Sequence, residues 1–155
     1  PKAICAAERL SALNSEITIR TYPIRLTEEN AQEIISQYDI VVDGCDNFST
    51  RYLINDICAE MGKVYVYGAI CGFEGQVSVF HYGEEKKSYR DLYPDEEEMR
   101  RMPPPPKGVM GITPAVTGSI EATEVLKIIC GFGEVLSGKL WTIDLRTLQS
   151  NKFSL

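Results

Sequence analysis

Acidic and amide side chains follow a short apolar run in the first third of the chain. Residues 40–42 are Ile-Val-Val, and Asp43, Asp46 and Asn47 come soon after them. A run that is apolar at every position is typical of a strand buried on both faces of a parallel sheet. Ligands of open α/β sheets bind just beyond the carboxyl ends of the strands. We therefore expect these polar side chains at a binding site.

Asp46 is the first candidate for chemistry, because it would stand just before the N-terminus of a helix. The helix dipole and free backbone amides keep a carboxylate ionised there, and such a carboxylate can hold Mg²⁺ on a phosphate chain. Asn47 could bond a phosphate or sugar oxygen, and Arg51, one turn on, could neutralise developing charge. Alternatively, Asp46 or Asn47 only caps the helix, and Arg51 forms a surface salt bridge.

Three other residues carry weaker signals. Lys2 lies on a first helical turn, where a single Lys is nearly always a solvated charge. His81 has no acid or nucleophile at a recognisable spacing, so we expect an edge-strand residue and not a base. Cys45, between Asp43 and Asp46, is either a reactive thiol, if the helix terminus lowers its pKa, or a packing residue.

Hydrophobic periodicity supplies the elements that must position these residues. The helix after Asn47 ends at Gly62, and its apolar face holds Leu53, Ile54, Ile57, Cys58 and Met61. In chain order we expect a helix at 2–13, a strand at 16–24, a helix after its N-cap Thr27, the strand at 40–42, the helix up to Gly62, strands at 64–68 and 76–82, a helix at 113–130, and strands at 139–145 and 147–155. This order predicts an α/β fold, a Rossmann-like, doubly wound and mainly parallel sheet with an antiparallel extension.

The helix at 113–130 is expected to begin with Thr113 as its N-cap and Pro114 at its first position. Its charged residues Glu121, Glu124 and Lys127 are expected to face solvent. The buried stripe would then be apolar and consist of Val116, Ile120, Val125, Leu126 and Ile129.

Residues 83–111 differ in character from the segments around them. They are acidic, then basic, and then carry four prolines at 103–106. A crossover loop of this length inside a compact domain is usually either functional or without fixed structure, and the sequence leaves both open.

Composition limits the class of protein. The 155 residues are 44% hydrophobic and 25% charged, enough for one globular domain over residues 1–155. No apolar run approaches the roughly 18 residues of a membrane span, and a net charge of −6 argues against non-specific nucleic-acid binding. The five cysteines form no C-x-x-C pair, so we expect a cytoplasmic protein with reduced thiols and no zinc site.

Four stretches, taken in order, resemble the MoeB/ThiF/HesA adenylyltransferases, relatives of the ubiquitin-activating enzymes. Each is a weak signal alone, but together they span nearly the whole chain at fitting separations. They are P-K-A-x-x-A-A-x-x-L-x-x-L-N at 1–14, D-x-V-V-D-G-C-D-N-F-x-x-R at 39–51, G-x-x-x-G-F-E-G-Q-V-x-V-F at 68–80, and G-V-M-G-I-x-P-x-V-x-G-S-x-x-A-x-E-x-L-K at 108–127.

The resemblance implies an enzyme and a site. In that family the C-terminal Gly-Gly carboxylate of a ubiquitin-like sulfur-carrier protein (ThiS- or MoaD-like) attacks the α-phosphate of ATP, in thiamine or molybdopterin cofactor biosynthesis, and pyrophosphate leaves. Matched by motif, Asp46 would hold Mg²⁺ and the phosphates with Asn47 beside it. Lys2 would contact the phosphate chain, and Arg51 would belong to the catalytic set. The family also implies a homodimer.

The match departs from the family's pattern in several places. The Gly-rich phosphate loop and the ribose-binding acid of the family precede the position of Pro1, so we expect the N-terminal nucleotide-binding half to be missing and the fragment alone to be inactive. A zinc-binding C-x-x-C pair aligns with residues 88–91, which contain no Cys, and the loop at 83–111 has no Cys for a sulfur or thioester relay. Two alternatives stay open: a non-catalytic ThiF-like domain that binds a partner, and half of a nicotinamide-dependent dehydrogenase.

Overall fold

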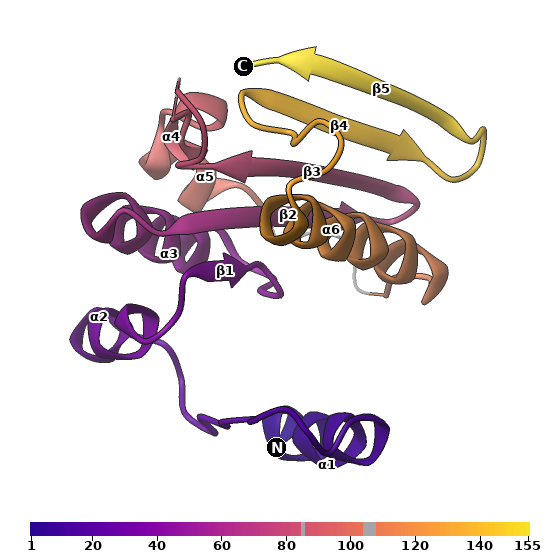
Figure 1. The fold of residues 1–155 in the computed structure, drawn as a ribbon. Helices are drawn as coiled ribbons and strands as arrows, with labels where there is room; N and C mark the ends of the chain where they lie inside the picture. Colours follow the sequence, from indigo (N-terminus) through magenta and orange to yellow (C-terminus); the bar gives the residue numbers. More distant parts are fainter. Residues whose placement is uncertain (85, 104–107) are drawn as a thin grey trace.

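The computed structural model describes residues 1–84, 86–103 and 108–155, and its centre is a five-stranded mixed sheet (Figure 1). The strands lie side by side in chain order: β1 (Ile40–Val42), β2 (Val64–Cys71), β3 (Glu74–Phe80), β4 (Lys139–Asp144) and β5 (Gln149–Ser154). The helices are α1 (Lys2–Leu13), α2 (Glu28–Ser36), α3 (Phe48–Met61), α4 (Tyr89–Leu92), α5 (Glu96–Arg101) and α6 (Ile112–Cys130). The predicted α/β class is confirmed.

The sheet is not mainly parallel, contrary to the prediction. β1 and β2 run parallel, whereas β2–β3, β3–β4 and β4–β5 are antiparallel pairs. A parallel pair needs a crossover connection, and α3 supplies it between β1 and β2. Short turns join β2 to β3, where Gly72 has φ +58°, and β4 to β5, through residues 145–148. Turns this short can only reverse the chain, so they fix the antiparallel pairing.

Helix ends follow the local sequence closely. The backbone N–H of Thr27 donates to Asn30 Oδ1 over 2.9 Å, so the predicted start of α2 at Thr27 is confirmed. Gly62 has φ +63°, a left-handed conformation that glycine adopts without steric cost, and it ends α3 as predicted.

Alternating residues of the sheet build two cores. Tyr65, Tyr67 and Phe80 lie on the face covered by α3 and are almost completely buried. Val66 and Val77 lie on the opposite face, which α6 covers. The period of two along each strand therefore places an aromatic core and an aliphatic core on opposite sides of one sheet.

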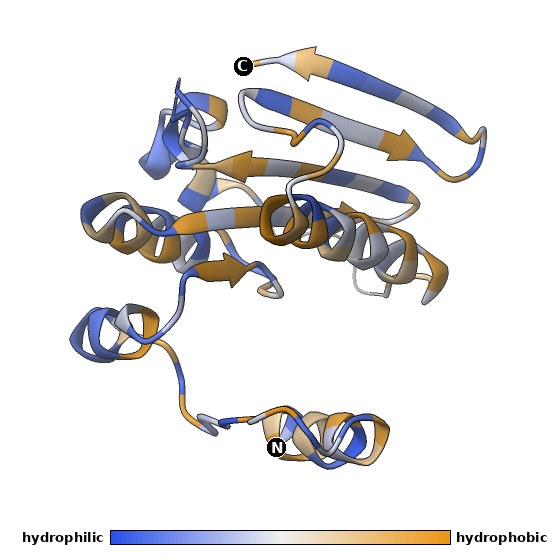
Figure 2. Ribbon diagram, in the orientation of Figure 1, coloured by the Kyte–Doolittle hydropathy of each residue, from blue (hydrophilic) through white to orange (hydrophobic). Residues whose placement is uncertain are grey.

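β1 is the edge of the described sheet, which corrects two expectations. The strand is hydrophobic along its whole length (Figure 2), yet Val42 is 47% exposed, because β2 alone pairs with it among the described strands. Residues 16–24 form no strand, and Ile17 and Ile24 are exposed. An alternating sequence becomes a strand only where a neighbour accepts its hydrogen bonds, and within the described chain this segment has none. Nearby, α1 stands apart from the sheet (Figure 1) and buries no residue.

The orientation of α6 differs in part from the predicted one: Ile120 and Val125 pack against the aliphatic core as predicted, but two of the charged residues are buried. Glu121 and Glu124 are only 7% and 1% exposed, whereas Leu126 and Ile129 are exposed. Glycine explains how a carboxylate fits against a sheet, because a Cβ atom on Gly68 would come within 2.2 Å of Glu121 Cδ. The predicted apolar stripe of α6 therefore lies partly on the outside.

Two contacts with residues outside the helix, one at Glu124 and one at Thr113, fix α6 in this orientation. Glu124 accepts hydrogen bonds from the Leu136 backbone N–H over 2.8 Å and from Lys127 Nζ over 2.5 Å. The predicted N-cap at Thr113 is wrong, since the helix begins at Ile112 with Gly111 as N-cap. The Thr113 hydroxyl instead donates to the Gly72 carbonyl over 2.9 Å and fastens the helix to the β2–β3 turn.

Residues 86–103 are folded, although they belong to the long loop predicted at 83–111. They contain α4 and α5, and Arg90 joins these helices to α3 through Asp56 (2.6 Å) and Glu96 (2.9 Å). Tyr89 is fully buried. The segment thus packs as a second layer on α3, while the proline run at 104–106 lies outside the described residues. None of the helices in the described ranges is long and apolar enough to cross a bilayer.

Candidate functional site

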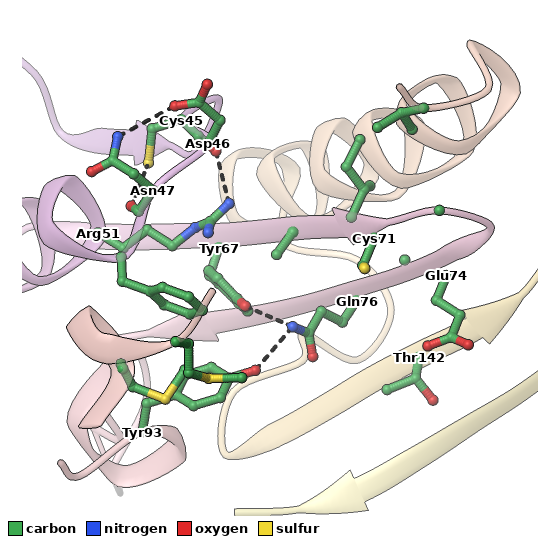
Figure 3. Close-up of a pocket in the computed structure, with 18 of the residues that line it drawn as sticks. Cys45, Asp46, Asn47, Arg51, Tyr67, Cys71, Glu74, Gln76, Tyr93 and Thr142 are labelled. Atoms are coloured by element: carbon green, nitrogen blue, oxygen red, sulfur yellow. Dashed lines mark hydrogen bonds between the residues drawn. The ribbon is translucent and has the colours of Figure 1, made fainter. Parts of the chain in front are cut away.

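A cavity of about 1100 Å³ opens at the carboxyl end of β1. Its walls come from the loop between β1 and α3, from the first turn of α3, and from α5. Its floor is the face of strands β2–β5 that carries Tyr67 and Gln76. Figure 3 shows Asp46 and Asn47 at one end of the cavity and Glu74 and Thr142 at the other.

Asp46 lies at the rim of this cavity and is exposed. Its Oδ1 accepts one hydrogen bond, from the side-chain amide of Asn47 over 3.3 Å. The side chain is not turned into the hydrophobic interior, and it lies at the carboxyl end of β1, where ligands of α/β sheets bind. The carboxylate is therefore available to a ligand.

Asn47 is the N-cap of α3. Its Oδ1 accepts a hydrogen bond from the Thr50 backbone N–H over 2.8 Å, so the capping role foreseen as an alternative belongs to Asn47 and not to Asp46. Since its oxygen is used by the helix and its amide group by Asp46, Asn47 orients the neighbouring carboxylate.

Arg51 lies in a buried ion pair instead of the surface salt bridge considered from sequence. Its Nε donates to Asp43 Oδ2 over 2.9 Å, and its Nη2 donates to the Cys45 carbonyl over 2.7 Å. Tyr65 donates to the same Asp43 oxygen over 3.1 Å. These bonds fix the loop that carries Asp46. The expected role of Arg51 in neutralising developing charge stays a prediction.

The surroundings of Cys45 favour the packing alternative over the reactive thiol. Its Sγ lies 2.9 Å from Asp43 Oδ1, to which it donates. Burial, and then the negative charge of Asp43, raise the pKa of Cys45 to about 12, which opposes thiolate formation. His81, the other weak candidate, lies just beyond β3 with its Nε2 3.0 Å from Asn55 Oδ1 and takes no part in the cavity.

Lys2 does not line the cavity that contains Asp46. It lies at the start of α1, in a shallow groove shared with Cys5 and Arg9. The structure brings Asp46, Asn47 and Arg51 together but leaves Lys2 elsewhere, so its proposed contact with a phosphate chain rests on the motif alone.

The floor of the cavity contains polar residues that sequence reasoning missed. They come from alternate positions of three strands: Glu74 and Gln76, Thr142 and Asp144, and Gln149 and Asn151. Pairs of polar residues at i and i+2 place both side chains on one face of a strand. This spacing was the available signal, but it does not say which face meets a cavity.

The residues of the cavity fit magnesium in part. No group of three or more His, Cys, Asp or Glu among the described residues could hold a metal ion alone. Mg²⁺ usually takes one or two carboxylates and obtains its other ligands from water and substrate phosphates, and the exposed Asp46 matches that mode. The two arginines of the described lining are less suited to phosphate, since Arg51 pairs with Asp43 and Arg100 with Glu96.

Comparison with known proteins defines the class. A model of the ThiF family matches residues 1–155, so the chain belongs to the ThiF family. It is 47% identical to a sulfur carrier protein adenylyltransferase of Thermus thermophilus, over 93% of this chain and 55% of that protein. It is 43% identical to a probable molybdopterin-synthase adenylyltransferase of Pyropia yezoensis, over 99% of this chain and 41% of that protein. The chain thus spans about half the length of the curated relatives it matches.

Solved structures agree on the fold. Escherichia coli MccB, solved with ATP, superposes with a TM-score of 0.79 at 18% identity, over 99% of this chain and 47% of that chain. PaaA superposes with a TM-score of 0.78 at 13% identity, over 99% of this chain and 47% of its own. The assignment to the MoeB/ThiF/HesA adenylyltransferases made from the four motifs is confirmed, and the dehydrogenase alternative gains no support.

Proposed function

We propose that this chain is part of an enzyme that uses ATP to adenylate the C-terminal Gly-Gly carboxylate of a ubiquitin-like sulfur-carrier protein. The exposed carboxylate of Asp46, at the rim of a cavity of about 1100 Å³, is the observation that carries the proposal. The names of the two relatives above support the substrate class. Residues 1–155 would form part of one adenylation domain in a homodimer that serves thiamine or molybdopterin cofactor biosynthesis.

The reaction asks for charge control more than for a protein nucleophile. A carboxylate oxygen attacks the α-phosphorus of ATP, the bond from that phosphorus to the pyrophosphate oxygen breaks, and an acyl-adenylate forms. Both reactants are anions, so their charge must be neutralised and their ends aligned. Mg²⁺ supplies part of that neutralisation when bound, and Asp46 is the residue that would hold it. Asn47 and the Asp43–Arg51 pair keep the Asp46 carboxylate at the rim.

The substitution Asp46→Ala in the full-length protein tests the proposal. We expect carrier-dependent ATP–pyrophosphate exchange to fall by roughly 100-fold or more, the usual cost of losing a group that stabilises charge in the transition state. Asp39→Ala is the matched control, because Asp39 is also exposed but lies before the amino end of β1. Equal exchange in the two variants would reject the role of Asp46.

Partner binding without turnover is a second candidate function. The charges of the cavity favour it, since both arginines of the described lining are already paired with carboxylates. A wild-type full-length protein that binds the carrier tightly but catalyses no exchange would establish this second function and exclude the first.

A further inference from the structure

The floor of the cavity is a row of side chains that crosses four strands. The register pairs Ala69 of β2 with Gln76 of β3, Gln76 with Thr142 of β4, and Thr142 with Asn151 of β5. All four residues line the cavity. The row therefore leads from the outer strand β5 toward β2, the strand next to β1 and its loop with Asp46.

This row carries no charge, whereas the next row does. Glu74 of β3 and Asp144 of β4 are opposite each other in the neighbouring row, and Arg146 contacts both, over 3.1 Å and 2.9 Å. A ligand lying over the uncharged row meets amide and hydroxyl groups, which suit the N–H and C=O groups of an extended peptide main chain. Ala69, with only a methyl group, leaves room for a close approach of such a ligand at the β2 end of the row.

Gln76 is the one residue of the row whose orientation is fixed by other side chains of the cavity. Its Nε2 donates to the Tyr67 hydroxyl over 2.9 Å and to the Tyr93 hydroxyl over 3.1 Å (Figure 3). Tyr67 is almost fully buried, and Tyr93 follows α4, so one anchor belongs to the sheet and one to the segment that covers it. Both amide hydrogens of Gln76 are used, and its Oε1 has no partner among the described residues. The side chain thus offers the cavity an acceptor only.

We propose that Gln76 Oε1 accepts a hydrogen bond from a main-chain N–H of the carrier's extended C-terminal tail. Gln76 is then a specificity-determining residue that sets the register of the tail, so that its terminal carboxylate reaches the end of the cavity at Asp46. The inference rests on the proposed function for its substrate class. It also gives the segment after α4 a part in tail binding, because Tyr93 holds the acceptor in place.

A double-substitution cycle between protein and peptide tests the hydrogen bond. The probe is a fluorescent hexapeptide of small uncharged residues ending in Gly-Gly, compared with analogues that carry a single N-methyl group on one of the last four amides. Binding to the full-length protein is measured by anisotropy without ATP. We expect one analogue to bind wild type about fivefold more weakly than the parent peptide, the usual worth of one such bond. Gln76→Met should weaken the parent to a similar degree and remove the difference between parent and analogue.

Two further variants separate this role from a structural one. Gln76→Glu keeps an acceptor oxygen and should keep the sensitivity to that N-methyl group. Gln32→Met is the matched control, because Gln32 is exposed on α2 and does not line the cavity, and it should leave that sensitivity unchanged. If no N-methyl position matters, if Gln76→Met weakens parent and analogue equally, or if the parent does not bind wild type, the inference is overturned. Peptide binding is measured without ATP, so it does not depend on the role proposed for Asp46. If the protein adenylates its carrier normally but no N-methyl group weakens binding, the role of Gln76 is rejected and the proposed function is not.

Discussion

Asp43 is the most enclosed charge of the site, with a fully buried side chain that accepts hydrogen bonds from Arg51, Tyr65 and Cys45. A buried carboxylate is costly unless its charge is compensated, and Arg51 alone brings a positive charge to it. The pair therefore stabilises the fold and, through the Cys45 carbonyl, shapes the loop that presents Asp46.

Arg51→Ala should lower the free energy of unfolding by about 3–5 kcal/mol, because it leaves Asp43 buried and without its cation. Denaturant unfolding measures this loss. Arg101→Ala is the control, since its pair with Glu97 is 78% and 79% exposed and such pairs contribute at most about 1 kcal/mol. Similar losses in the two variants would contradict the claim that Arg51 stabilises the fold by compensating the buried charge of Asp43.

At the scale of elements, α6 and the sheet meet through polar groups as well as through the aliphatic core. Glu121 is 7% exposed, and its Oε1 and the hydroxyl of Thr117 have no hydrogen-bond partner within the described residues. Glycines on β2 and β3 give these side chains room, since a Cβ on Gly68 or Gly75 would come within 2.2 Å of Glu121 or Thr117. The packing of α6 therefore depends on two missing side chains in the sheet.

The free energy of unfolding should fall as pH rises from about 4.5 to above 7. Burial, and then the charge of Asp43, raise the pKa of Glu121 to about 7 in the folded chain, against 4.5 for an ordinary Glu. Below pH 4.5 the carboxyl is protonated in both the folded and the unfolded state, so Glu121 does not lower the free energy of unfolding. Between the two values only the unfolded chain ionises, so stability falls, by at most about 3 kcal/mol above pH 7.

Glu121→Gln should remove this part of the pH dependence, as followed by urea unfolding at several pH values. Glu60→Gln, at an exposed position of α3, is the control and should leave the profile unchanged. A Glu121→Gln profile parallel to that of wild type would show that Glu121 does not titrate in this way.

Gly68→Ala should destabilise the protein by about 1–3 kcal/mol, because the new methyl group would overlap the Glu121 carboxyl group. Thermal or denaturant unfolding gives the value. Gly118→Ala in α6 has no atom within 4 Å of the new Cβ, and it should stabilise the helix by about 0.5–1 kcal/mol. An unchanged stability for Gly68→Ala would mean that α6 does not press its carboxylates against the sheet.

For the whole molecule, α1 differs from the layers around the sheet in how much of it is buried. α3, α4 and α5 are tied together by Arg90 and by a group of tyrosines, whereas α1 has no buried residue. Local stability follows burial, so opening free energies should differ widely along the chain.

Hydrogen exchange should show this difference directly. In the 155-residue chain we expect the amides of α1 to exchange with an opening free energy near zero, while those of α3 approach the global value. Exchange followed by mass spectrometry resolves the two segments. Strong protection of α1 would contradict the expectation, and a dependence of that protection on protein concentration would point to the homodimer implied by the family.

Short-range features of the fold were predictable from the sequence. Thr27 and Gly62 mark helix ends because capping and a left-handed turn involve only neighbouring residues, and the run at 40–42 marks a strand because its residues favour one. Asp46 could be placed at the carboxyl end of a strand for the same reason, since a strand, a polar loop and a helix follow one another within a few residues.

Only the tertiary structure decided what depends on distant residues. It made Arg51 a buried partner of Asp43, it turned Glu121 and Glu124 toward the sheet, and it brought Gln76 and Tyr93 into one cavity. The sequence alone determined the four longer helices, α1, α2, α3 and α6, and most of the strands, because local backbone preference settles these. Which face each segment buries was settled by space, and for α6 the space came from glycines of two strands, β2 and β3, that are distant from the helix in sequence.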